Sequence, residues 1–410
     1  MDTTRNSALS QNSEPKIRLR FIERLFVRLM KRLRHGSMRI EFPSGACVVV
    51  GDHSSPMVIL QIVKPDFFKR VFSGGSVGFG EAYVDGLWTT TDLSEVLKMM
   101  ARNQREVGRL RKGFSLITQQ LNRFYHLARK NTLKKSRENI QAHYDLSNDF
   151  YETFLDPTMT YSSAYFKGDH ETLEQGQLNK IDRMLDLAGV QAGDSILEIG
   201  SGWGALAKRA AERGCTVKTI TLSNEQFEYS KELFDASGVS ERVHICLQDY
   251  RVLQGQFDAV LSCEMIEAVG KEYLPSYFEV IRDSLKPGAK AVIQAITISD
   301  DRYDQYCRSC DWIQKHIFPG GHLPSPGAIR GHVDEAGVMQ VVQMDAFGRD
   351  YAETLRRWAK AFNGQGEEIK RLGFDETFQR KWNYYLSYCE AGFDTGLIDV
   401  QHVVIEKLKS

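Results

Sequence analysis

The stretch that decides the fold is Asp194-Ser-Ile-Leu-Glu198-Ile-Gly200-Ser-Gly202-Trp-Gly204. An apolar strand runs into a glycine-rich turn, and a helix is predicted directly after the turn. Because glycine has no side chain, the backbone amides of such a turn can approach a ligand closely, and the N-terminus of the following helix favours negative charge. The stretch therefore predicts a ligand-binding turn between a strand and a helix.

Strands and helices alternate on both sides of this turn. Strands are predicted at 195–199, 216–222, 243–247, 258–262 and 289–298, and helices at 205–213, 224–236 and 274–285. This alternation is typical of an α/β fold with a doubly wound, Rossmann-like parallel sheet. An insertion is expected at about 300–325, and segments at 338–344, 351–362 and 400–407 would complete the sheet and its cover.

The glycine spacing and the acidic residue before it indicate which ligand the turn binds. Nicotinamide-binding folds use a similar turn but place their third glycine later. Glu198 stands just before the first glycine, where it would repel a pyrophosphate but could face the ammonium group of a methionine moiety. The sequence thus favours S-adenosylmethionine over a dinucleotide as the cofactor.

Polar residues also follow the next two predicted strands. Thr221 and Gln226 lie where ribose recognition is expected, and Gln248 and Asp249 lie where a carboxylate could accept a hydrogen bond from an adenine amine. Ordinary turn and capping chemistry would explain each cluster alone. Sheets of this kind bind ligands at the carboxyl ends of their strands, so three polar clusters at successive strand ends favour a binding site.

The zero formal net charge of the 410 residues hides two basic segments. Residues 16–34 hold eight basic and one acidic residue, and residues 102–138 hold eleven basic and two acidic residues. In the first segment apolar residues recur at helical spacing opposite Arg24, Arg28, Lys31 and Arg32. This pattern predicts a basic amphipathic helix, which either lies on an anionic membrane surface or packs against another domain.

Four regions are expected along the chain. Residues 1–36 form a disordered tail plus the basic helix, 37–100 a small α+β domain, 101–139 a basic helical linker, and 140–410 the catalytic domain. In the small domain, short strands are predicted at 38–41, 47–50 and 57–63, a helix at 65–71, and a tight turn at domain contacts over 74–80.

Composition and cysteine content indicate a globular protein without disulfides. Apolar residues make up 42% and charged residues 26%, which excludes a wholly disordered or collagen-like chain. The seven cysteines are scattered and odd in number, so reduced thiols in a cytoplasmic protein are expected. No signal peptide or run of about 18 apolar residues occurs. Neither a metal site nor a nucleic-acid partner is expected.

Several motifs resemble those of cyclopropane-fatty-acyl-phospholipid synthases, and the resemblance covers about residues 140–410. The stretch Gly78-Phe-Gly-Glu-Ala-Tyr-Val-Asp-Gly-Leu-Trp88 also resembles the N-terminal domain of the longer, bacterial-type members. The other motifs are the entrance segment His143–Phe150, Leu155-Asp-Pro157 and Thr160–Phe166, then Leu197–Gly204, Leu247–Arg251, Cys263-Glu-Met-Ile-Glu-Ala-Val-Gly270 and Ile317–Ser325.

The resemblance implies a class I methyltransferase fold and a defined reaction. The methyl group of S-adenosylmethionine is transferred to a cis double bond of a phospholipid acyl chain, and the resulting carbocation loses a proton and closes to a cyclopropane. An alkene is a weak nucleophile, so the enzyme must hold it close to the sulfonium and in line with it. The resemblance also implies a cofactor role for Tyr161 and Ser162, a possible homodimer and peripheral association with the inner face of the membrane.

The family resembled uses a bound bicarbonate as its base. Carried over by motif, the bicarbonate cradle falls on Ser163, Glu267, Gln294, the backbone of Ile296, and Tyr351. Serine and glutamine here replace a cysteine and a histidine, which leaves the identity of the base open. Glu267 is the expected leading catalytic residue. Cys389 matches a cysteine often singled out as catalytic, but the chemistry needs no thiolate, and a buried inert thiol is the preferred interpretation.

Three alternatives remain open from the sequence. The same double bond could be converted to a methylene- or methyl-branched chain, which the replaced residues at 163 and 294 make plausible. A related chemistry could methylate a small amine, although the basic helix and N-terminal domain would then lack a purpose. The chain could also be a non-catalytic lipid or cofactor binder, against which the intact acidic and glycine positions speak.

Overall fold

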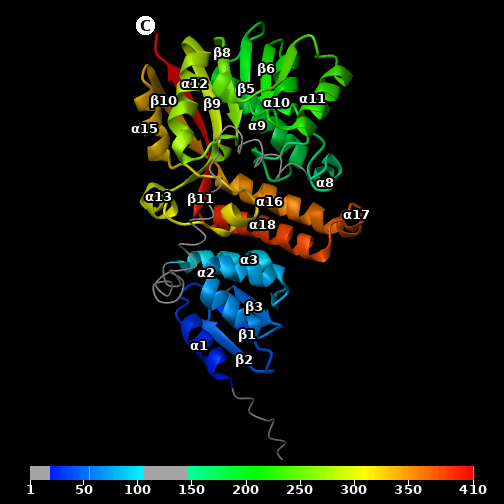
Figure 1. Ribbon diagram of the computed structural model, residues 1–410, viewed down its shortest axis with the longest axis vertical. Helices are drawn as coiled ribbons and strands as arrows, with labels where there is room; N and C mark the ends of the chain where they lie inside the picture. Colours follow the sequence, from blue (N-terminus) through cyan, green and yellow to red (C-terminus); the bar gives the residue numbers. More distant parts are fainter. Residues whose placement is uncertain (1–18, 55, 105–145, 410) are drawn as a thin grey trace, which may run out of the picture.

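The computed structural model describes residues 19–54, 56–104 and 146–409, and the structural statements below concern these residues. They form two units, coloured blue to cyan and green to red in Figure 1. The second basic segment, predicted over 102–138, lies almost entirely outside the described residues, so its predicted linker role stays a prediction.

The larger unit is built on a seven-stranded sheet with the order β10-β11-β9-β8-β5-β6-β7. The five strands β5 to β9 run parallel, whereas β11 pairs antiparallel with both β9 and β10. The predicted Rossmann-like fold is confirmed, with one strand reversed near its edge. The strands are β5 (Ser195–Ile199), β6 (Thr216–Thr221), β7 (Val243–Leu247), β8 (Phe257–Cys263), β9 (Leu285–Ile298), β10 (Met339–Ala346) and β11 (Ile398–Lys407).

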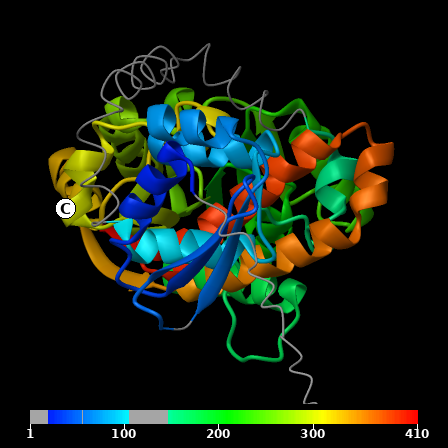
Figure 2. The same cartoon turned by 90° about the horizontal axis from the view of Figure 1, so that it is seen from below.

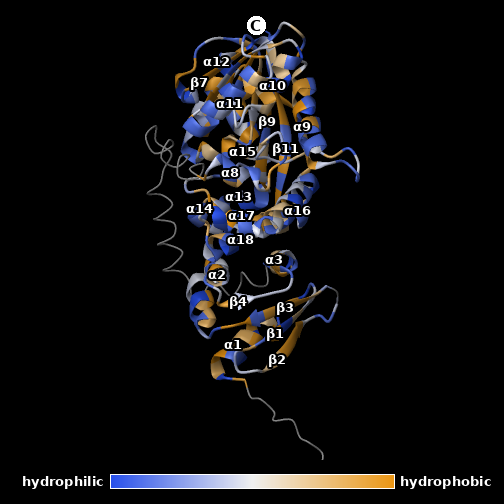
Figure 3. Cartoon of the chain, turned by 90° about the vertical axis from the view of Figure 1, so that its right-hand side faces the viewer, coloured by the Kyte–Doolittle hydropathy of each residue, from blue (hydrophilic) through white to orange (hydrophobic). Residues whose placement is uncertain are grey.

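Helices cover both faces of this sheet. Apolar side chains of α9, α10 and α11 form one core with it, and those of α12 and α15 form another. Figure 3 shows hydrophobic strands between helices with hydrophilic outer faces. The helices are α8 (Asn148–Glu152), α9 (Leu173–Ala188), α10 (Ala205–Glu212), α11 (Asn224–Ala236), α12 (Leu274–Ser284), α13 (Asp300–Tyr306), α14 (Trp312–His316), α15 (Pro326–Ala336), α16 (Gly348–Gly364), α17 (Gly366–Arg371) and α18 (Glu376–Asp394). Single 3-10 turns occupy Tyr250–Val252, Ile266–Ala268 and Lys271–Tyr273.

The smaller unit contains a four-stranded sheet with the order β2-β1-β3-β4. The three strands predicted here are confirmed within one residue at their ends. Its elements are α1 (Phe21–Met30), β1 (Ser37–Glu41), β2 (Cys47–Gly51), β3 (Met57–Ile62), α2 (Asp66–Val84), β4 (Trp88–Thr89) and α3 (Leu93–Arg102).

Helix α1 is the predicted basic amphipathic helix. Phe26, Val27 and Met30 are buried within the small unit, whereas Ile22, Leu25 and Leu29 are half-buried and Phe21 is 75% exposed. Phe26 packs edge-on against Phe67 and Phe68 of α2, with ring centroids 5.3 and 5.8 Å apart. This packing agrees with the alternative in which the helix contacts another part of the protein, and the predicted membrane contact stays a prediction. The basic side chains of the opposite face, Arg24, Arg28, Lys31 and Arg32, are exposed.

The glycine-rich segment 74–80 was expected to form a tight turn, and the structure instead places it inside α2. The helix bends at Gly75, where φ is 59° and ψ is −133°. The predicted location at a domain contact is correct. A Cβ added at Gly80 would lie 2.6 Å from the Trp312 ring and 2.7 Å from Tyr384, so only glycine lets the helix approach the larger unit this closely.

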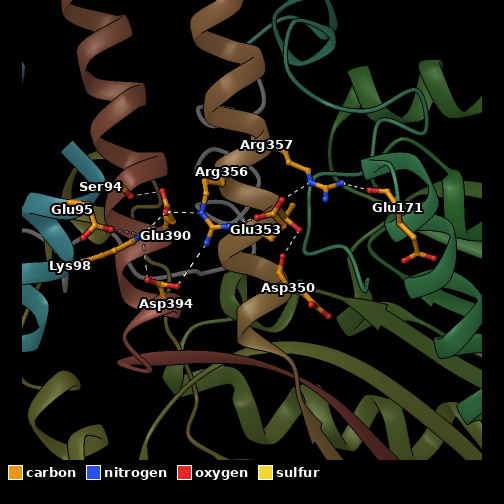
Figure 4. A network of polar contacts seen from close by, with 11 residues as sticks. Ser94, Glu95, Lys98, Glu171, Asp350, Glu353, Arg356, Arg357, Glu390 and Asp394 are labelled. Carbon is orange, nitrogen blue, oxygen red and sulfur yellow. Dashed lines mark hydrogen bonds and ion pairs between the residues drawn. The ribbon is translucent and has the colours of Figure 1, made fainter. Parts of the chain in front are cut away.

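Helices α16 and α18 lie between the seven-stranded sheet and the small unit (Figure 1), and from below the small unit lies in front of them (Figure 2). An ion-pair network crosses this boundary (Figure 4). Lys98 of α3, 8% exposed, lies 2.9 Å from Glu390 of α18, and Arg356 of α16 lies 3.1 Å from the same carboxylate. Burial lowers the pKa of Lys98, but Glu390 and its acidic neighbours raise it more, and the net direction is upward.

Candidate active site

A pocket lies at the carboxyl ends of β5, β6, β7 and β8, where the sequence predicts the ligand. Eight of the ten predicted cofactor residues line it: Tyr161, Ser162, Glu198, Gly200, Gly202, Thr221, Gln226 and Gln248. Residues from four separate strand ends and from the entrance segment thus meet in one place, as expected for a doubly wound sheet.

The glycine turn is shaped by left-handed backbone conformations. Gly200 and Gly202 have φ of +95° and +50°. The backbone amides of Gly200 and Ser201 donate to the carbonyl of Ile220, which ties the turn to β6. Gly204 does not line the pocket; it caps α10 with φ +93°, and a Cβ there would lie 2.9 Å from the Phe234 ring. Its role is therefore to let the helix begin close to α11.

Glu198 is the buried acid of this pocket. It is 2% exposed and accepts a hydrogen bond of 2.5 Å from the Thr219 hydroxyl. Burial raises the pKa of Glu198 to about 8, although that hydrogen bond and the charge of Lys180 oppose the shift. Burial disfavours the ionised form of this carboxyl group, and a positively charged ligand bound next to it would stabilise that form.

Asp249, predicted to meet an adenine amine, is engaged by a neighbouring arginine in this structure. Its carboxylate accepts hydrogen bonds from Arg251, at 2.8 Å from Nε and 2.7 Å from Nη2, and the residue is absent from the pocket lining. Each oxygen accepts one bond from the guanidinium and Oδ2 keeps a further acceptor site, so the adenine contact of Asp249 stays a prediction. Gln248 and Tyr250, on either side of it, do line the pocket.

The residues predicted to hold an anion converge on a carboxylate of the chain itself. Glu264 accepts a hydrogen bond of 2.9 Å from the Ser163 amide and one of 2.7 Å from Nε2 of Gln294 on the same oxygen. Its other oxygen accepts a bond of 2.6 Å from the Tyr351 hydroxyl. Glu264 also lines the cofactor pocket, so these three donors hold a negative group directly beside the cofactor site.

Glu267 lies next to this carboxylate but is held differently. One oxygen accepts a hydrogen bond of 2.5 Å from the Ile296 amide, and the other is buried without a partner among the described residues. Burial and the neighbouring charge of Glu264 raise the pKa of Glu267 to about 8. Burial also raises the pKa of Glu264, and the hydrogen bonds from Tyr351, Ser163 and Gln294 oppose that rise. Because Glu264 has three donors and Glu267 has one, we assign the negative charge of the pair to Glu264 and the shared proton to Glu267.

Glu264 is also held in an uncommon backbone conformation. Its φ is +48°, in the left-handed region that glycine enters freely and other residues enter at a cost of roughly 1–2 kcal/mol. Such strain persists where the surroundings impose it, and it clusters at functional sites. The strained residue thus lies at the wall of the cofactor pocket.

The hydrogen bonds in this cradle do not fit the expected bicarbonate, because protein carboxylates already occupy the donors that would bind it. Ser163, Gln294 and Tyr351 donate to Glu264, and the Ile296 amide donates to Glu267. The Ser163 amide, Gln294, Tyr351 and the Ile296 amide thus already bind protein carboxylates, and the Ser163 hydroxyl donates to the Ala164 carbonyl. A second anion in the same cradle would lack donors and would meet the Glu264 charge.

Sequence reasoning missed two residues of this site. Glu264 stands within the quoted Cys263–Gly270 motif, but its participation depends on a backbone conformation that the motif does not reveal. Lys180 of α9 is 1% exposed, lines the pocket, and donates to the Ser162 hydroxyl at 2.6 Å. The only signal in the sequence was a lysine within an apolar helical pattern, which ordinarily indicates an exposed position.

Cys389 lies on α18 and is half-buried. Burial and the nearby acidic charges of Asp311 and Glu264 raise the pKa of its thiol well above the usual range. A thiol in such surroundings is a poor nucleophile.

Substituting Cys389 with alanine is therefore expected to leave turnover within about threefold of the wild type, because only a reactive thiolate would make the residue essential. Methyl-transfer assays on the purified variant, compared at equal folded fraction, check this. A loss of a hundredfold or more would reinstate the thiol as a catalytic group.

Within residues 19–54, 56–104 and 146–409, no cluster of three or more His, Cys, Asp or Glu side chains is arranged to hold a metal ion. No helix in this part of the chain is long and apolar enough to cross a membrane. All seven cysteines are free thiols in this structure.

Comparison with known proteins places the chain in a family. Residues 131–403 match the family described as mycolic acid cyclopropane synthetase. The chain is 39% identical to the tuberculostearic acid methyltransferase of Mycobacterium tuberculosis, over 91% of this chain and 88% of that protein. It is 34% identical to the cyclopropane-fatty-acyl-phospholipid synthase of Escherichia coli K12, over 85% and 87%.

Solved structures agree with this placement. A mycolic acid cyclopropane synthase complexed with SAH and CTAB superposes with a TM-score of 0.61 at 31% identity, over 66% of this chain and 98% of that one. A coclaurine N-methyltransferase bound to SAH superposes equally well at 20% identity and shares the fold. The chain is a class I methyltransferase that uses S-adenosylmethionine, and it belongs to the mycolic acid cyclopropane synthetase family.

Proposed function

We propose that this enzyme transfers the methyl group of S-adenosylmethionine to a cis double bond of a phospholipid acyl chain, and that proton loss then closes a cyclopropane ring. The observation that carries the proposal is the carboxylate of Glu264, held by three donors at the wall of the cofactor pocket. Methyl transfer to an alkene leaves a carbocation. The reaction ends only when a base beside the cofactor site takes a proton from it.

The atoms balance without an external reductant. The C–S bond of the cofactor breaks as one alkene carbon bonds the methyl carbon, and the positive charge moves to the other alkene carbon. Glu264 accepts a proton from the added methyl group, and the electron pair released forms the third bond of the ring. The acyl chain gains one CH2 unit, and the proton remains on the carboxylate pair until it leaves to water. Fixed negative charge at Glu264 also stabilises the carbocation before proton loss.

A second product is supported by the relative that is 39% identical, a tuberculostearic acid methyltransferase. If a hydride first shifts between the two former alkene carbons, loss of a proton from the methyl group gives a methylene branch instead of a ring. This product has the same composition as the cyclopropane. A saturated methyl branch would require a further hydride donor.

The experiment supplies deuteromethyl-labelled S-adenosylmethionine and vesicles of a monounsaturated phospholipid, followed by mass spectrometry of the acyl chains. Either product retains two deuterons and gains about 16 mass units, and matched vesicles of saturated phospholipid gain none. Mild catalytic hydrogenation then adds two hydrogens to a methylene branch and leaves the ring unchanged. Absence of any mass gain in every unsaturated lipid offered would contradict the proposal.

The cofactor affinity is expected to rise with pH. Below pH 8 a cationic cofactor must displace the proton of Glu198, whose pKa is raised to about 8, so affinity should increase roughly tenfold per pH unit up to that value and then level off. Titration calorimetry in buffers of different ionisation enthalpy measures both the affinity and the released proton.

Glu198→Gln removes the titrating group and serves as the decisive variant. Its affinity should be independent of pH and about 10- to 100-fold weaker at pH 8.5, the loss of one charge-assisted interaction. Glu228→Gln, an exposed position on the neighbouring helix α11, is the matched control and should behave as wild type. Wild-type affinity that does not change from pH 6 to 8 would contradict this assignment.

We also propose that the exposed basic face of α1 contacts an anionic membrane surface. Arg24, Arg28, Lys31 and Arg32 are exposed, while the apolar residues of the helix other than Phe21 are buried or half-buried, so the contact would be electrostatic and sensitive to salt. Reversing these four charges to glutamate should weaken sedimentation with anionic vesicles and leave methyl transfer to detergent-dispersed lipid intact. Unchanged vesicle binding would limit α1 to its packing role.

A further inference from the structure

A buried histidine lies behind the donor that holds Glu264, on a strand that the mechanism does not otherwise use. His402 of β11 is fully buried, and its Nε2 lies 2.9 Å from Oε1 of Gln294 on the adjacent strand β9. β11 pairs with β9 in such a register that residues 402 and 294 are direct partners. The contact is therefore set by the sheet itself.

The other ring nitrogen of His402 fixes its tautomer. Nε of Arg183, on α9, donates a hydrogen bond of 3.1 Å to Nδ1. An acceptor at Nδ1 requires the neutral ring with its proton on Nε2. Burial and the charges of Arg183 and Lys180 lower the pKa of His402 to about 3, so the ring stays neutral throughout the working pH range.

The fixed tautomer in turn determines which way the amide of Gln294 points. Nε2–H of His402 donates to Oε1 of Gln294, so the amide nitrogen must face the other side. There it donates to Glu264 at 2.7 Å and to the Ser163 carbonyl at 3.3 Å. A flipped amide would place its oxygen against the Glu264 carboxylate and remove one of the three donors that stabilise the charge.

Arg183 is itself held from the surface side. Its Nη2 donates to the carboxylate of Asp345 on β10, which also accepts a bond of 2.6 Å from Gln343. The guanidinium lies over the Tyr165 ring, 4.8 Å from its centroid. These contacts leave the guanidinium a single orientation, with Nε towards His402.

We propose that Asp345, Arg183 and His402 form a positioning relay that fixes the amide of Gln294 and thereby keeps Glu264 ionised. The inference rests on the proposed role of Glu264 as proton acceptor, and it extends the active site to β10 and β11. None of the three relay residues touches the reacting atoms; they act through Gln294.

Loss of the relay is expected to shift the pKa of Glu264 in one direction. With Gln294 flipped or free, the ionised form of Glu264 loses a donor, so its pKa rises and a larger fraction is protonated at neutral pH. The acidic limb of the pH–rate profile should then move to higher pH. The other titratable groups that face Glu264 are unchanged by the relay variants: Glu267, Tyr351, Lys180, Cys263 and Cys389.

The test uses His402→Phe, which keeps a ring against Phe347 and Tyr165 but removes both nitrogens, and Arg183→Met, which keeps the apolar stem. Arg209→Met is the matched control, because Arg209 pairs with Asp182 beside Arg183 but has no contact with His402. For each relay variant, kcat at pH 7 should fall about tenfold and recover at least in part above pH 8.5, while the affinity for S-adenosylmethionine stays within twofold.

A second measurement requires no lipid substrate. Glutamate labelled with 13C at the side-chain carboxyl gives a titration curve for Glu264, assigned by its absence from the Glu264→Gln spectrum. Each relay variant should shift this curve upward by about one pH unit, and Arg209→Met should not. The relay can thus be confirmed or rejected even if the proposed lipid reaction is wrong.

The double variant Gln294→Leu, His402→Phe separates positioning from general support. If His402 acts only through Gln294, adding the histidine change to Gln294→Leu should cause no further loss of kcat and no further shift of the Glu264 curve. Additive effects, or a uniform loss of kcat at every pH with an unshifted Glu264 curve, would overturn the relay.

Discussion

Replacing Glu264 with glycine is expected to lower turnover by roughly a hundred- to ten-thousandfold, the usual contribution of a positioned proton acceptor. Glycine adopts the φ of +48° at this position freely, so the backbone should be relaxed and the fold retained. Binding of S-adenosylmethionine should persist, because Glu198 and the glycine turn are untouched. Single-turnover assays with calorimetric cofactor titration separate the two effects.

The same variant should regain activity when a small carboxylate is supplied. Removing the side chain leaves the Ser163 amide, the Gln294 amide and the Tyr351 hydroxyl around a vacated space without their acceptor. Formate or bicarbonate at millimolar concentration should enter this space and restore at least about a tenth of the lost rate. Buffers freed of carbon dioxide are needed to measure the baseline.

Glu264→Gln is the control for this rescue. Glutamine fills the same space without a charge, so turnover should fall and added formate should have no effect. The wild type should be indifferent to bicarbonate, since its cradle already holds a carboxylate. Full turnover of the glycine variant in carbon dioxide-free buffer would show that Glu264 is not the base, and would return that role to Glu267.

The sequence predicted the half of the fold whose signals are local. Strands β5 to β8 and the helices between them alternate in sequence and in space, so their patterns and the glycine turn place the cofactor site correctly. Helix α18 was not predicted. Tyr384, Tyr385, Leu386 and Ser387 are consecutive and all buried, because α16 and the small unit cover the helix on opposite sides. A helix covered in this way shows no amphipathic stripe.

The active site, too, could be predicted only in part from the sequence. Ser163, Gln294, Tyr351 and Ile296 were identified from their motifs as donors around an anion, and they do surround negative groups. The motifs in the sequence identified the donor residues, but they did not show that the acceptor is the carboxylate of Glu264. The carboxylate of Glu264 enters the cradle only because its residue takes a left-handed conformation at the end of β8, which depends on the packing around it.

The second large effect is expected at the boundary between the two units, where Glu390 is the centre of the network in Figure 4. Its side chain is 5% exposed and contacts Ser94 and Lys98 of α3 as well as Arg356 of α16. Glu390→Ala should lower the free energy of unfolding by about 3 kcal/mol, because it leaves the buried ammonium of Lys98 without its closest partner. Urea unfolding measures the loss.

Glu367→Ala is the matched control. Glu367 of α17 forms an ion pair with Lys370 in which both side chains are exposed, so its loss should change stability by less than 0.5 kcal/mol. The double variant Lys98→Met, Glu390→Leu should recover most of the loss, because an apolar pair of similar volume leaves no buried charge unpaired.

Helix α16 carries both Arg356 and Tyr351. If the boundary steadies the active site through this helix, Glu390→Ala should also lower kcat, and the apolar double variant should restore it. Equal stability losses at Glu390 and Glu367 would mean that the network does not hold the two units together.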